Sequence, residues 1–150
     1  MPTARTPREV FLELVTGVAE GRWDALPDLY SDETHVVHPF HPLADGAITS
    51  RDALRHHFTL PDGVPPLPRR TVENVVIHDT ADPEVIVAEF EYHGEAADTG
   101  EPVVIPAIFV MRVRDGEIVS SRDYLDHLAS ARFRGQLREV LDAVGTKHGA

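Results

Sequence analysis

The chain has 150 residues and a mass of 16.6 kDa, which is enough for one domain with a buried core but not for two. Its 25 acidic residues outnumber the 14 lysines and arginines, and the net charge of -11 argues against binding to nucleic acid or to anionic membrane surfaces. The sequence has no cysteine, which excludes disulfides, thiolate nucleophiles and cysteine-bound metal centres. Because there is no long apolar run and no signal-peptide pattern, we expect a cytoplasmic protein with a single domain over residues 1–150 and a core from about 6 to 145.

The N-terminal part of the chain has the pattern of three helices and one strand. Thr6 to Glu9 combine a capping box with a proline at the first helical position, and Gly21 is a typical stop for the helix that follows. The next expected elements are a short helix with Trp23, Leu26, Leu29 and Tyr30 on its apolar side, a strand over Thr34–Phe40 and a helix that starts at Thr49-Ser50. Four prolines interrupt Leu60–Arg70, and we expect this loop to be either a surface connection or a lid.

The second half of the chain has the alternating pattern of consecutive strands. The predicted strands are Thr71–Asp79, Val85–Glu95, Val103–Arg114 and Glu117–Leu125. Asp115-Gly116, between the last two strands, is typical of a tight β-hairpin. A closing helix is predicted from about Asp126 to Val144, where Gly145 ends it. Helices followed by antiparallel strands indicate an α+β fold, in which the helices pack on one face of a curved sheet.

The third of these strands is apolar on both of its faces. Ile105 and Phe109 lie on one face, whereas Ile108 and Val110 lie on the other. A strand with two apolar faces needs cover on both, and the helices can cover only one of them. We therefore expect a homodimer that forms through the outer face of the sheet.

Several strings along the chain are similar to a known family. They are GRWDALPDLYSDETHVVHPF, the helix start TSRDAL, DPEVIVAEFEYHGEA and VMRVRDGEIVSSRDYLDHL, and they cover most of residues 6–137. On these strings the chain resembles the nuclear transport factor two-like superfamily, and within it the SnoaL-like polyketide cyclases and ketosteroid-isomerase-like proteins. The resemblance implies a cone, in which a strongly bent antiparallel sheet wraps around helices and leaves a deep apolar pocket. It also implies a dimer but no single activity, because the same cone carries isomerases, cyclases, epoxide hydrolases, dehydratases and non-catalytic modules.

The resemblance makes ordinary ketosteroid isomerisation unexpected. In the steroid isomerases of this fold a carboxylate base stands just before Pro-Phe on the first strand, and the matching residue is His38. Those enzymes build an oxyanion hole from a tyrosine and a protonated aspartic acid, and the matching residues are Leu14 and Phe109. His38 can still act as a base, because an unperturbed imidazole titrates near neutral pH. The alternative is a strand-end histidine that bonds to the backbone or to water.

Asp123 is the main candidate for catalysis. Limonene-epoxide-hydrolase-like members carry the similar string Arg-Asp-Tyr-Phe-Asp on the last strand, and its first aspartate, which matches Asp123, serves catalysis. Strand alternation turns Asp123 to the same side as Ser121 and away from Arg122. A carboxyl group in an apolar pocket has a raised pKa and can move protons near neutral pH. The alternatives are an ion pair with Arg122 or Arg112, or a cap on the following helix.

The second long strand bears on the epoxide-hydrolase alternative. With one inserted residue, Glu89 and Glu91 take the places of an arginine and a second aspartate in those enzymes, so that Glu89 reverses the charge. We favour a solvated outer face for Glu89, Glu91 and His93, with Phe90 and Tyr92 facing inward. Epoxide hydrolysis is therefore the less favoured function.

Cofactor and metal chemistry find little support in the sequence. His35, His38 and His41 are spaced so that they alternate between opposite faces of a strand, which does not suit a shared metal ion. There is no glycine-rich phosphate loop and no G-x-S-x-G nucleophile motif. We expect no metal and no cofactor.

Together these residues predict a small cofactor-independent enzyme that carries out proton transfer on an apolar, carbonyl-bearing metabolite, through isomerisation, cyclisation or dehydration. Asp123 is expected to be the principal acid or base and His38 its partner across the pocket mouth, and Arg122, Tyr124 and Glu91 are expected to support them. The expected substrate-binding residues are Trp23, Tyr30, Phe40, Tyr92, Phe109 and Ser121. The alternative is a non-catalytic small-molecule-binding or dimerisation module, whose cavity its own side chains would fill. An open apolar cavity that both Asp123 and His38 face distinguishes the two hypotheses.

Overall fold

The N-terminal helices begin at the residues that their capping patterns predict. In the computed structural model, which describes residues 3–147, the Thr6 hydroxyl accepts a hydrogen bond from the backbone N–H of Glu9 at the start of α1 (Pro7–Glu20). Gly21 ends α1 with a φ of 74°, a left-handed conformation that glycine adopts without strain. The next helical elements are the short 3-10 helix η1 (Trp23–Leu29) and α2 (Arg51–His57), which Ser50 caps.

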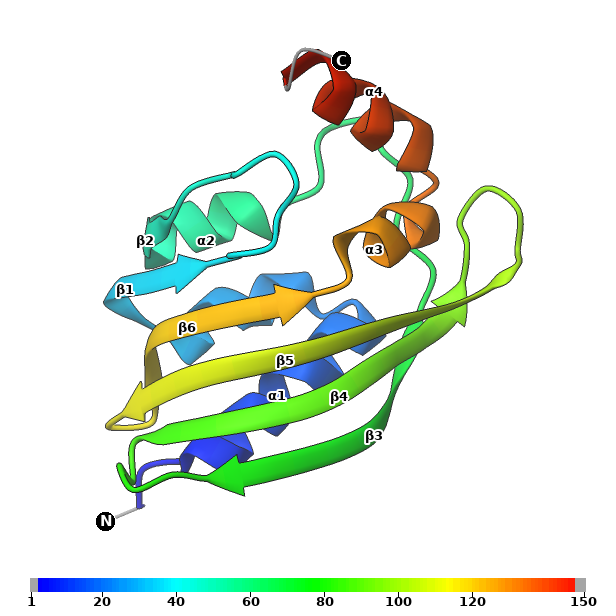
Figure 1. Ribbon diagram of the computed structural model, residues 1–150. Coiled ribbons are helices and arrows are strands. Elements are labelled where there is room, and N and C mark those ends of the chain that lie inside the picture. The colour runs from blue at the N-terminus through cyan, green and yellow to red at the C-terminus, as the bar shows by residue number, and fades with distance from the viewer. Residues whose placement is uncertain (1–2, 148–150) are drawn as a thin grey trace.

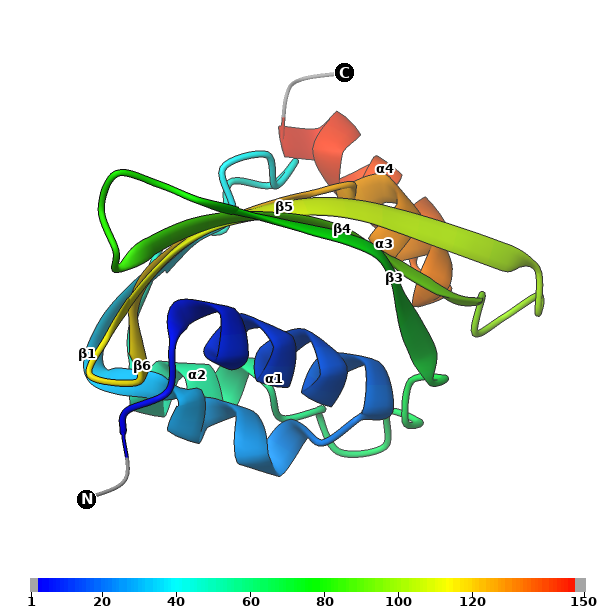
Figure 2. The same ribbon diagram turned by 90° about the horizontal axis from the view of Figure 1, so that it is seen from below.

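A six-stranded sheet follows, and it curves around these helices. Its strands are β1 (Tyr30–Val37), β2 (Ile48–Ser50), β3 (Arg70–Asp79), β4 (Val85–Glu95), β5 (Pro102–Arg114) and β6 (Glu117–Leu125). Their order across the sheet is β2-β1-β6-β5-β4-β3, with β1 and β6 parallel and all other neighbours antiparallel. Figure 1 shows this order, and Figure 2 shows α1, η1 and α2 on the concave side of the sheet. The predicted α+β fold with a bent sheet around helices is confirmed.

The first strand differs from its prediction at both ends. β1 starts at Tyr30, so that this tyrosine belongs to the sheet and not to the preceding helix. The strand ends at Val37 and does not reach Phe40, because Pro39 lacks the N–H that a ladder needs. The short β2 was not predicted, since a strand of three residues leaves almost no periodic pattern.

The closing helix is in fact two helices. α3 spans His127–Phe133 and α4 spans Leu137–Lys147. Gly135 separates them with a φ of 70°, which an uninterrupted right-handed helix does not allow. The apolar side of α4 is not part of the core, because the helix has no buried residue and Leu141 is 47% exposed.

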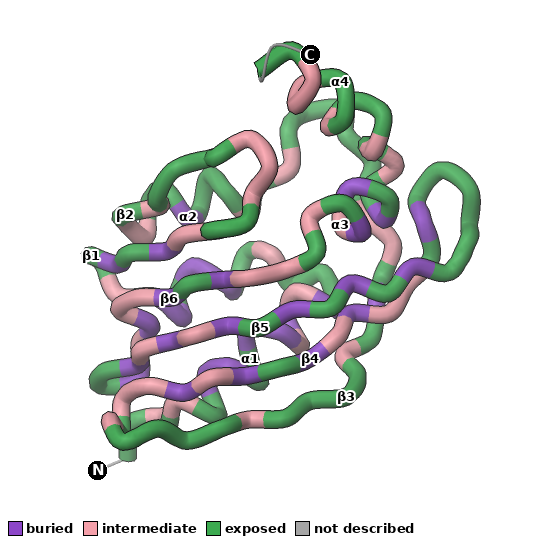
Figure 3. The backbone as a smooth tube through the Cα atoms, viewed as in Figure 1, coloured by how far each residue is buried: buried purple, intermediate pink, exposed green. Residues whose placement is uncertain are grey.

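The core lies between α1 and the concave face of the sheet. Phe11 of α1 is fully buried, and its ring meets Phe90 and Phe109 edge-on, with centroids 5.3 and 6.2 Å away. Buried positions alternate with intermediate or exposed ones along β4 and β5 (Figure 3). The outer face of β5 remains open, with Val104 43% and Ile108 41% exposed. No helix within the described residues is long and apolar enough to cross a membrane.

A glycine in β4 brings α3 close to the sheet. A Cβ atom on Gly94 would lie only 2.7 Å from the Cε2 atom of Phe133 and 3.2 Å from the Cβ atom of Arg70. Phe133 is fully buried at the end of α3, so its ring cannot move aside to make room for an added methyl group. Gly94 therefore fixes the distance between the sheet and the helix that follows β6.

We predict that Gly94→Ala lowers the free energy of unfolding by about 1–3 kcal/mol, because the added methyl group overpacks a full site. Urea unfolding followed by circular dichroism measures the change. The double variant Gly94→Ala/Phe133→Leu should be destabilised by less than the sum of its single variants, because the smaller side chain makes room. An unchanged unfolding midpoint for Gly94→Ala would contradict this close packing.

Candidate active site

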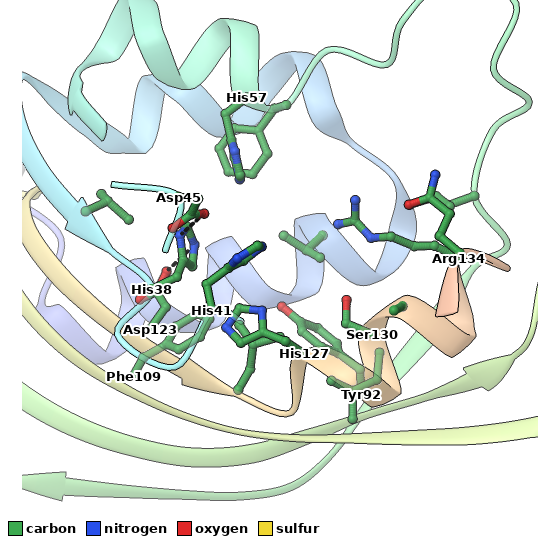
Figure 4. A pocket seen from close by; sticks show the side chains of 18 of the residues that line it. His38, His41, Asp45, His57, Tyr92, Phe109, Asp123, His127, Ser130 and Arg134 are labelled. Carbon is green, nitrogen blue, oxygen red and sulfur yellow. Dashed lines mark ion pairs between the residues drawn. The ribbon is translucent and has the colours of Figure 1, made fainter. Parts of the chain in front are cut away.

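A cavity of about 370 Å³ opens between the concave face of the sheet and the helices. Its wall is largely apolar and includes Leu14, Val18, Trp23, Ile105, Phe109 and Leu125. The polar groups around it come from separate elements, as Figure 4 shows. A volume of this size suits a small organic molecule that is mostly buried when bound.

Asp123 lies in the wall of this cavity without a cationic partner. It is 6% exposed and stands opposite Phe109 on β5. The Ser121 hydroxyl donates a hydrogen bond to its Oδ1 atom, and the Nε2 atom of His38 lies 3.9 Å from its Oδ2 atom. Among residues 3–147, no arginine or lysine forms an ion pair with Asp123, so the predicted alternatives with Arg112 and Arg122 do not occur.

Burial raises the pKa of Asp123 to about 7, and the Ser121 hydrogen bond only partly opposes this shift. The cause is the loss of water around the carboxylate, which disfavours its charged form. Near neutral pH both the acid and its conjugate base are therefore populated. This is the condition under which one carboxyl group can both accept and return a proton.

His38 faces the same cavity from the chain just after β1. Its side chain is 11% exposed, and its Nδ1 atom lies 3.3 Å from the Oδ2 atom of Asp45. Burial lowers the pKa of His38, although the nearby Asp45 carboxylate opposes the shift. Desolvation therefore favours the neutral imidazole, which can accept a proton.

Other histidines surround the cavity mouth. The ring of His57 from α2 stacks on that of His38 at 5.8 Å, and His127 of α3 lies 4.7 Å from His41 between ring centroids. Burial lowers the pKa of both His57 and His127 to about 4. In the described part of the chain, no three histidine, aspartate or glutamate side chains are grouped so that they could hold a metal ion.

Two tyrosines provide proton donors inside the cavity. Tyr30 is 2% and Tyr92 is 7% exposed, and both line the cavity wall. Burial raises the pKa of each phenol above its ordinary value, so both hydroxyl groups stay protonated at neutral pH. Figure 4 shows the Tyr92 side chain pointing into the cavity.

Most of the expected substrate-binding residues come together in the structure. Trp23, Tyr30, Tyr92 and Phe109 line the cavity. Ser121 is buried beneath Asp123 and acts on it through the hydrogen bond, so it supports the carboxyl group and does not line the wall.

Phe40, which was also expected to bind substrate, does not line the cavity. It is 70% exposed, and its ring meets Tyr124 at 5.0 Å on the outer side of the sheet. Phe40 follows the end of β1, so strand alternation does not set its direction.

The three residues expected to support the site face the other way. Arg122 and Tyr124 alternate with Asp123 along β6 and therefore point to the outer face. Glu91 lies on the outer face of β4, where its Oε1 atom accepts hydrogen bonds from Asn74 and from His93. The solvated outer face predicted for β4 is thus confirmed, and no carboxylate from this strand accompanies Asp123.

Several cavity residues were not predicted as site residues. They are Asp45, His57, Arg70, His127, Ser130 and Arg134. Most stand at the ends of helices or strands or in loops, where no periodic pattern indicates direction. Gly135 marks the end of α3, but a helix break does not indicate that the Arg134 side chain points into the cavity.

Comparison with known proteins identifies one family and many similar folds. A model of the SnoaL-like domain matches residues 11–121, which is more than half of the chain. Comparison with curated proteins gives no match.

Three solved structures illustrate the likeness. An isomerase candidate from Bacillus subtilis shares 22% identity over 86% of this chain and 92% of its own, with a TM-score of 0.73. A ketosteroid isomerase-like fold from Catenulispora acidiphila, in complex with trimethylamine, shares 19% identity over 89% and 95% of the two chains, with a TM-score of 0.64. A polyketide cyclase candidate from Pseudomonas putida shares 16% identity over 89% and 98%, with a TM-score of 0.63. At these identities the likeness is one of fold.

We predict that Asp123→Asn changes how stability depends on pH. An unfolded aspartate has a pKa near 3.9, whereas burial raises the pKa of Asp123 to about 7. The stability contributed by this group is therefore fully present below about pH 4 and is lost as the pH rises through about 7. Between pH 4 and pH 8 the free energy of unfolding of the variant should therefore rise by up to about 4 kcal/mol relative to that of the wild type. This follows from the pKa difference between the folded and unfolded states, since one pKa unit is about 1.36 kcal/mol.

Urea unfolding of both proteins between pH 4 and pH 9 measures this difference. Glu91→Gln is the matched control and should show no gain with rising pH, because hydrogen bonds from His93 and Asn74 lower the pKa of Glu91. A constant difference between Asp123→Asn and the wild type across the range would contradict the raised pKa.

Proposed function

The chain belongs to the SnoaL-like domain family, and we propose that it is a cofactor-independent enzyme that catalyses proton transfer on a largely apolar, carbonyl-bearing metabolite. The reaction is an isomerisation, a cyclisation or a dehydration. The single observation that carries this proposal is the Asp123 carboxyl group, 6% exposed in the wall of a cavity of about 370 Å³ and without a cationic partner in the described residues. Structural neighbours described as isomerase and polyketide cyclase candidates support the same class of chemistry.

Asp123 acts first as a base and then as an acid. The carboxylate takes the proton from the carbon beside the substrate carbonyl, and the electron pair of that C–H bond moves into an enolate. The neutral carboxyl group then returns the proton to another carbon, which completes an isomerisation, or gives it to a departing hydroxyl group that leaves as water. A pKa of about 7 suits both steps, because neither protonation state is strongly favoured.

The developing enolate needs a proton donor at its oxygen. The oxyanion-hole positions of the steroid isomerases are apolar here, since Leu14 and Phe109 occupy them. The protonated hydroxyl groups of Tyr30 and Tyr92 are the donors that the cavity offers instead. His38 is the partner of Asp123, and with its Nε2 atom 3.9 Å from the Oδ2 atom of that carboxyl group it exchanges protons with it through a bridging water molecule.

A non-catalytic binding module is the other function considered. Such a module gains nothing from a desolvated carboxyl group in its ligand cavity, because the group destabilises the fold above its pKa. The epoxide-hydrolase alternative needs an arginine and a second carboxylate on β4, and Glu89 and Glu91 point away from the cavity. Proton transfer remains the function that these side chains support best.

We predict that Asp123→Asn lowers turnover by about 10²–10⁴-fold, because the amide can neither accept nor return the proton. Mass spectrometry of co-purifying molecules and a thermal-shift screen of apolar carbonyl compounds identify the substrate, and turnover is then followed by absorbance or chromatography. Glu91→Gln, which removes a carboxylate from the outer face, should leave turnover unchanged. Full activity in Asp123→Asn would remove this residue from the mechanism.

We also propose that the protein forms a homodimer through the outer face of the sheet. This face carries Val104 and Ile108, which are 43% and 41% exposed on β5, next to the outward Phe40–Tyr124 pair. Burial of these apolar side chains against a second copy would remove them from water.

The predicted result is that Ile108→Lys converts the dimer to a monomer, because a charge placed in an apolar contact is costly. Light scattering coupled to size-exclusion chromatography measures the mass. Val75→Lys on the edge strand β3, where the valine is 37% exposed, is the matched control and should stay dimeric. A monomeric wild type would overturn this proposal.

A further inference from the structure

Two arginines enter the cavity from the side remote from the Asp123 carboxyl group. Arg134 follows the end of α3, and Figure 4 shows its guanidinium extending into the cavity from the opposite side to Asp123 and His38. Arg70 stands at the start of β3 and is 8% exposed. Neither residue takes part in the proton transfer described above.

Neither guanidinium has a carboxylate partner within residues 3–147. Arg134 makes no side-chain hydrogen bond or ion pair there, although its side chain remains accessible through the open cavity. The Nε atom of Arg70 is buried and unbonded. The guanidinium of Arg70 instead lies over the rings of Tyr92 and Phe133, at 5.0 and 4.5 Å from their centroids.

This lack of an acidic partner is unusual for Arg70, which is buried, whereas Arg134 is exposed. On the outer surface Arg112 and Arg114 both pair with Glu84, so acidic partners are used elsewhere in the chain. A chain with 25 acidic residues has ample carboxylates to neutralise two cavity arginines. Leaving the buried Arg70 unpaired costs stability, because its charge is desolvated and the charge of Arg134 repels it.

The positive charge of Arg134 affects the pKa values of Arg70 and of His57. Desolvation lowers the pKa of Arg70 to about 10, and the positive charge of Arg134 contributes to this shift. The same charge contributes to the lowered pKa of His57. Both arginines remain charged at neutral pH, so this side of the cavity carries positive charge that no described side chain neutralises.

We infer that this side of the cavity binds a carboxylate of the substrate, which the Arg134 guanidinium holds while Arg70 supplies a second positive charge beside it. The inference rests on the proposed function, because it names the substrate of the same cavity as an apolar oxo acid or its equivalent. The geometry of a guanidinium matches the two oxygens of a carboxylate. The bound carboxylate would direct the carbonyl-bearing part of the molecule along the apolar wall toward Asp123.

A carboxylate fits this cavity better than a phosphate does. Asp45 and Asp123 line the same cavity, and a dianion would meet stronger repulsion from them than a monoanion. The apolar wall around Leu60, Leu67 and Val140 also favours a ligand with a single charged end.

The test uses isothermal titration calorimetry at pH 8 with a series of arylalkanoic acids, their primary amides and the matching alkyl phosphates. We expect the acids to bind at least 10-fold more tightly than their amides. Arg134→Gln should weaken the acids about 10–100-fold and leave the amides unchanged, because only the charge-assisted pair is lost. Arg138→Gln is the matched control, since Arg138 is exposed on α4 and does not line the cavity.

Each other outcome overturns the inference. Equal affinity for acids and amides, or an unchanged affinity in Arg134→Gln with a native melting temperature, would show that no carboxylate site exists here. Tighter binding of the alkyl phosphates than of the acids would overturn the carboxylate assignment and indicate a phosphate site.

Asp123→Asn separates this inference from the proposed function. The variant should lose turnover and still bind the acids, and at pH 8 it should bind them at least as tightly as the wild type, because one negative charge is gone from the cavity. Loss of turnover without acid selectivity would refute only the carboxylate site. Acid selectivity with full turnover in Asp123→Asn would refute only the proposed mechanism.

Discussion

The separation of opposite charges within one desolvated cavity is the constraint on which the site depends. Asp123 has a hydroxyl neighbour and an imidazole at 3.9 Å, whereas Arg134 and Arg70 stand apart from it without acidic partners. If either guanidinium paired with Asp123, the pKa of the Asp123 carboxyl group would fall well below neutrality, and this group could no longer return a proton. The same contact would neutralise the positive charge on the other side. By holding these groups apart, the fold leaves Asp123 able to transfer a proton and the arginines able to bind an anion.

Sheet topology produces this arrangement. β1 runs parallel to β6 with Val36 opposite Ser121 and Val37 opposite Arg122, so the chain that leaves β1 brings His38 next to Asp123. A parallel pair joins strands that are distant in sequence, and here it brings the first and last strands into contact. The sheet also curves around α1 (Figure 2). Residues of β4, β5 and β6 that this helix does not cover, among them Tyr92, Ile105 and Asp123, line the cavity.

The parts of this structure with regular periodicity could be predicted from the sequence. The four long strands, the Asp115-Gly116 hairpin and the inward direction of Asp123 all follow from alternation and turn chemistry, and the structure agrees with them. Phe40 was wrongly expected in the pocket because it lies beyond the end of its strand. Arg134 was missed because its position depends on how α3 packs over Gly94, which is a tertiary contact without a local signal.

The origin of the cavity wall in both halves of the chain has a consequence for biosynthesis. Leu14 and Trp23 come from the first helical elements, whereas Leu125, His127 and Arg134 follow the last strand. β6 lies between β1 and β5 in the sheet, so the sheet is incomplete until β6 has been synthesised. A nascent chain that has emerged only as far as β5 therefore exposes apolar surface that is buried in the finished fold. Ribosome-bound intermediates of this protein should accordingly depend on chaperones until the final quarter of the polypeptide has been translated.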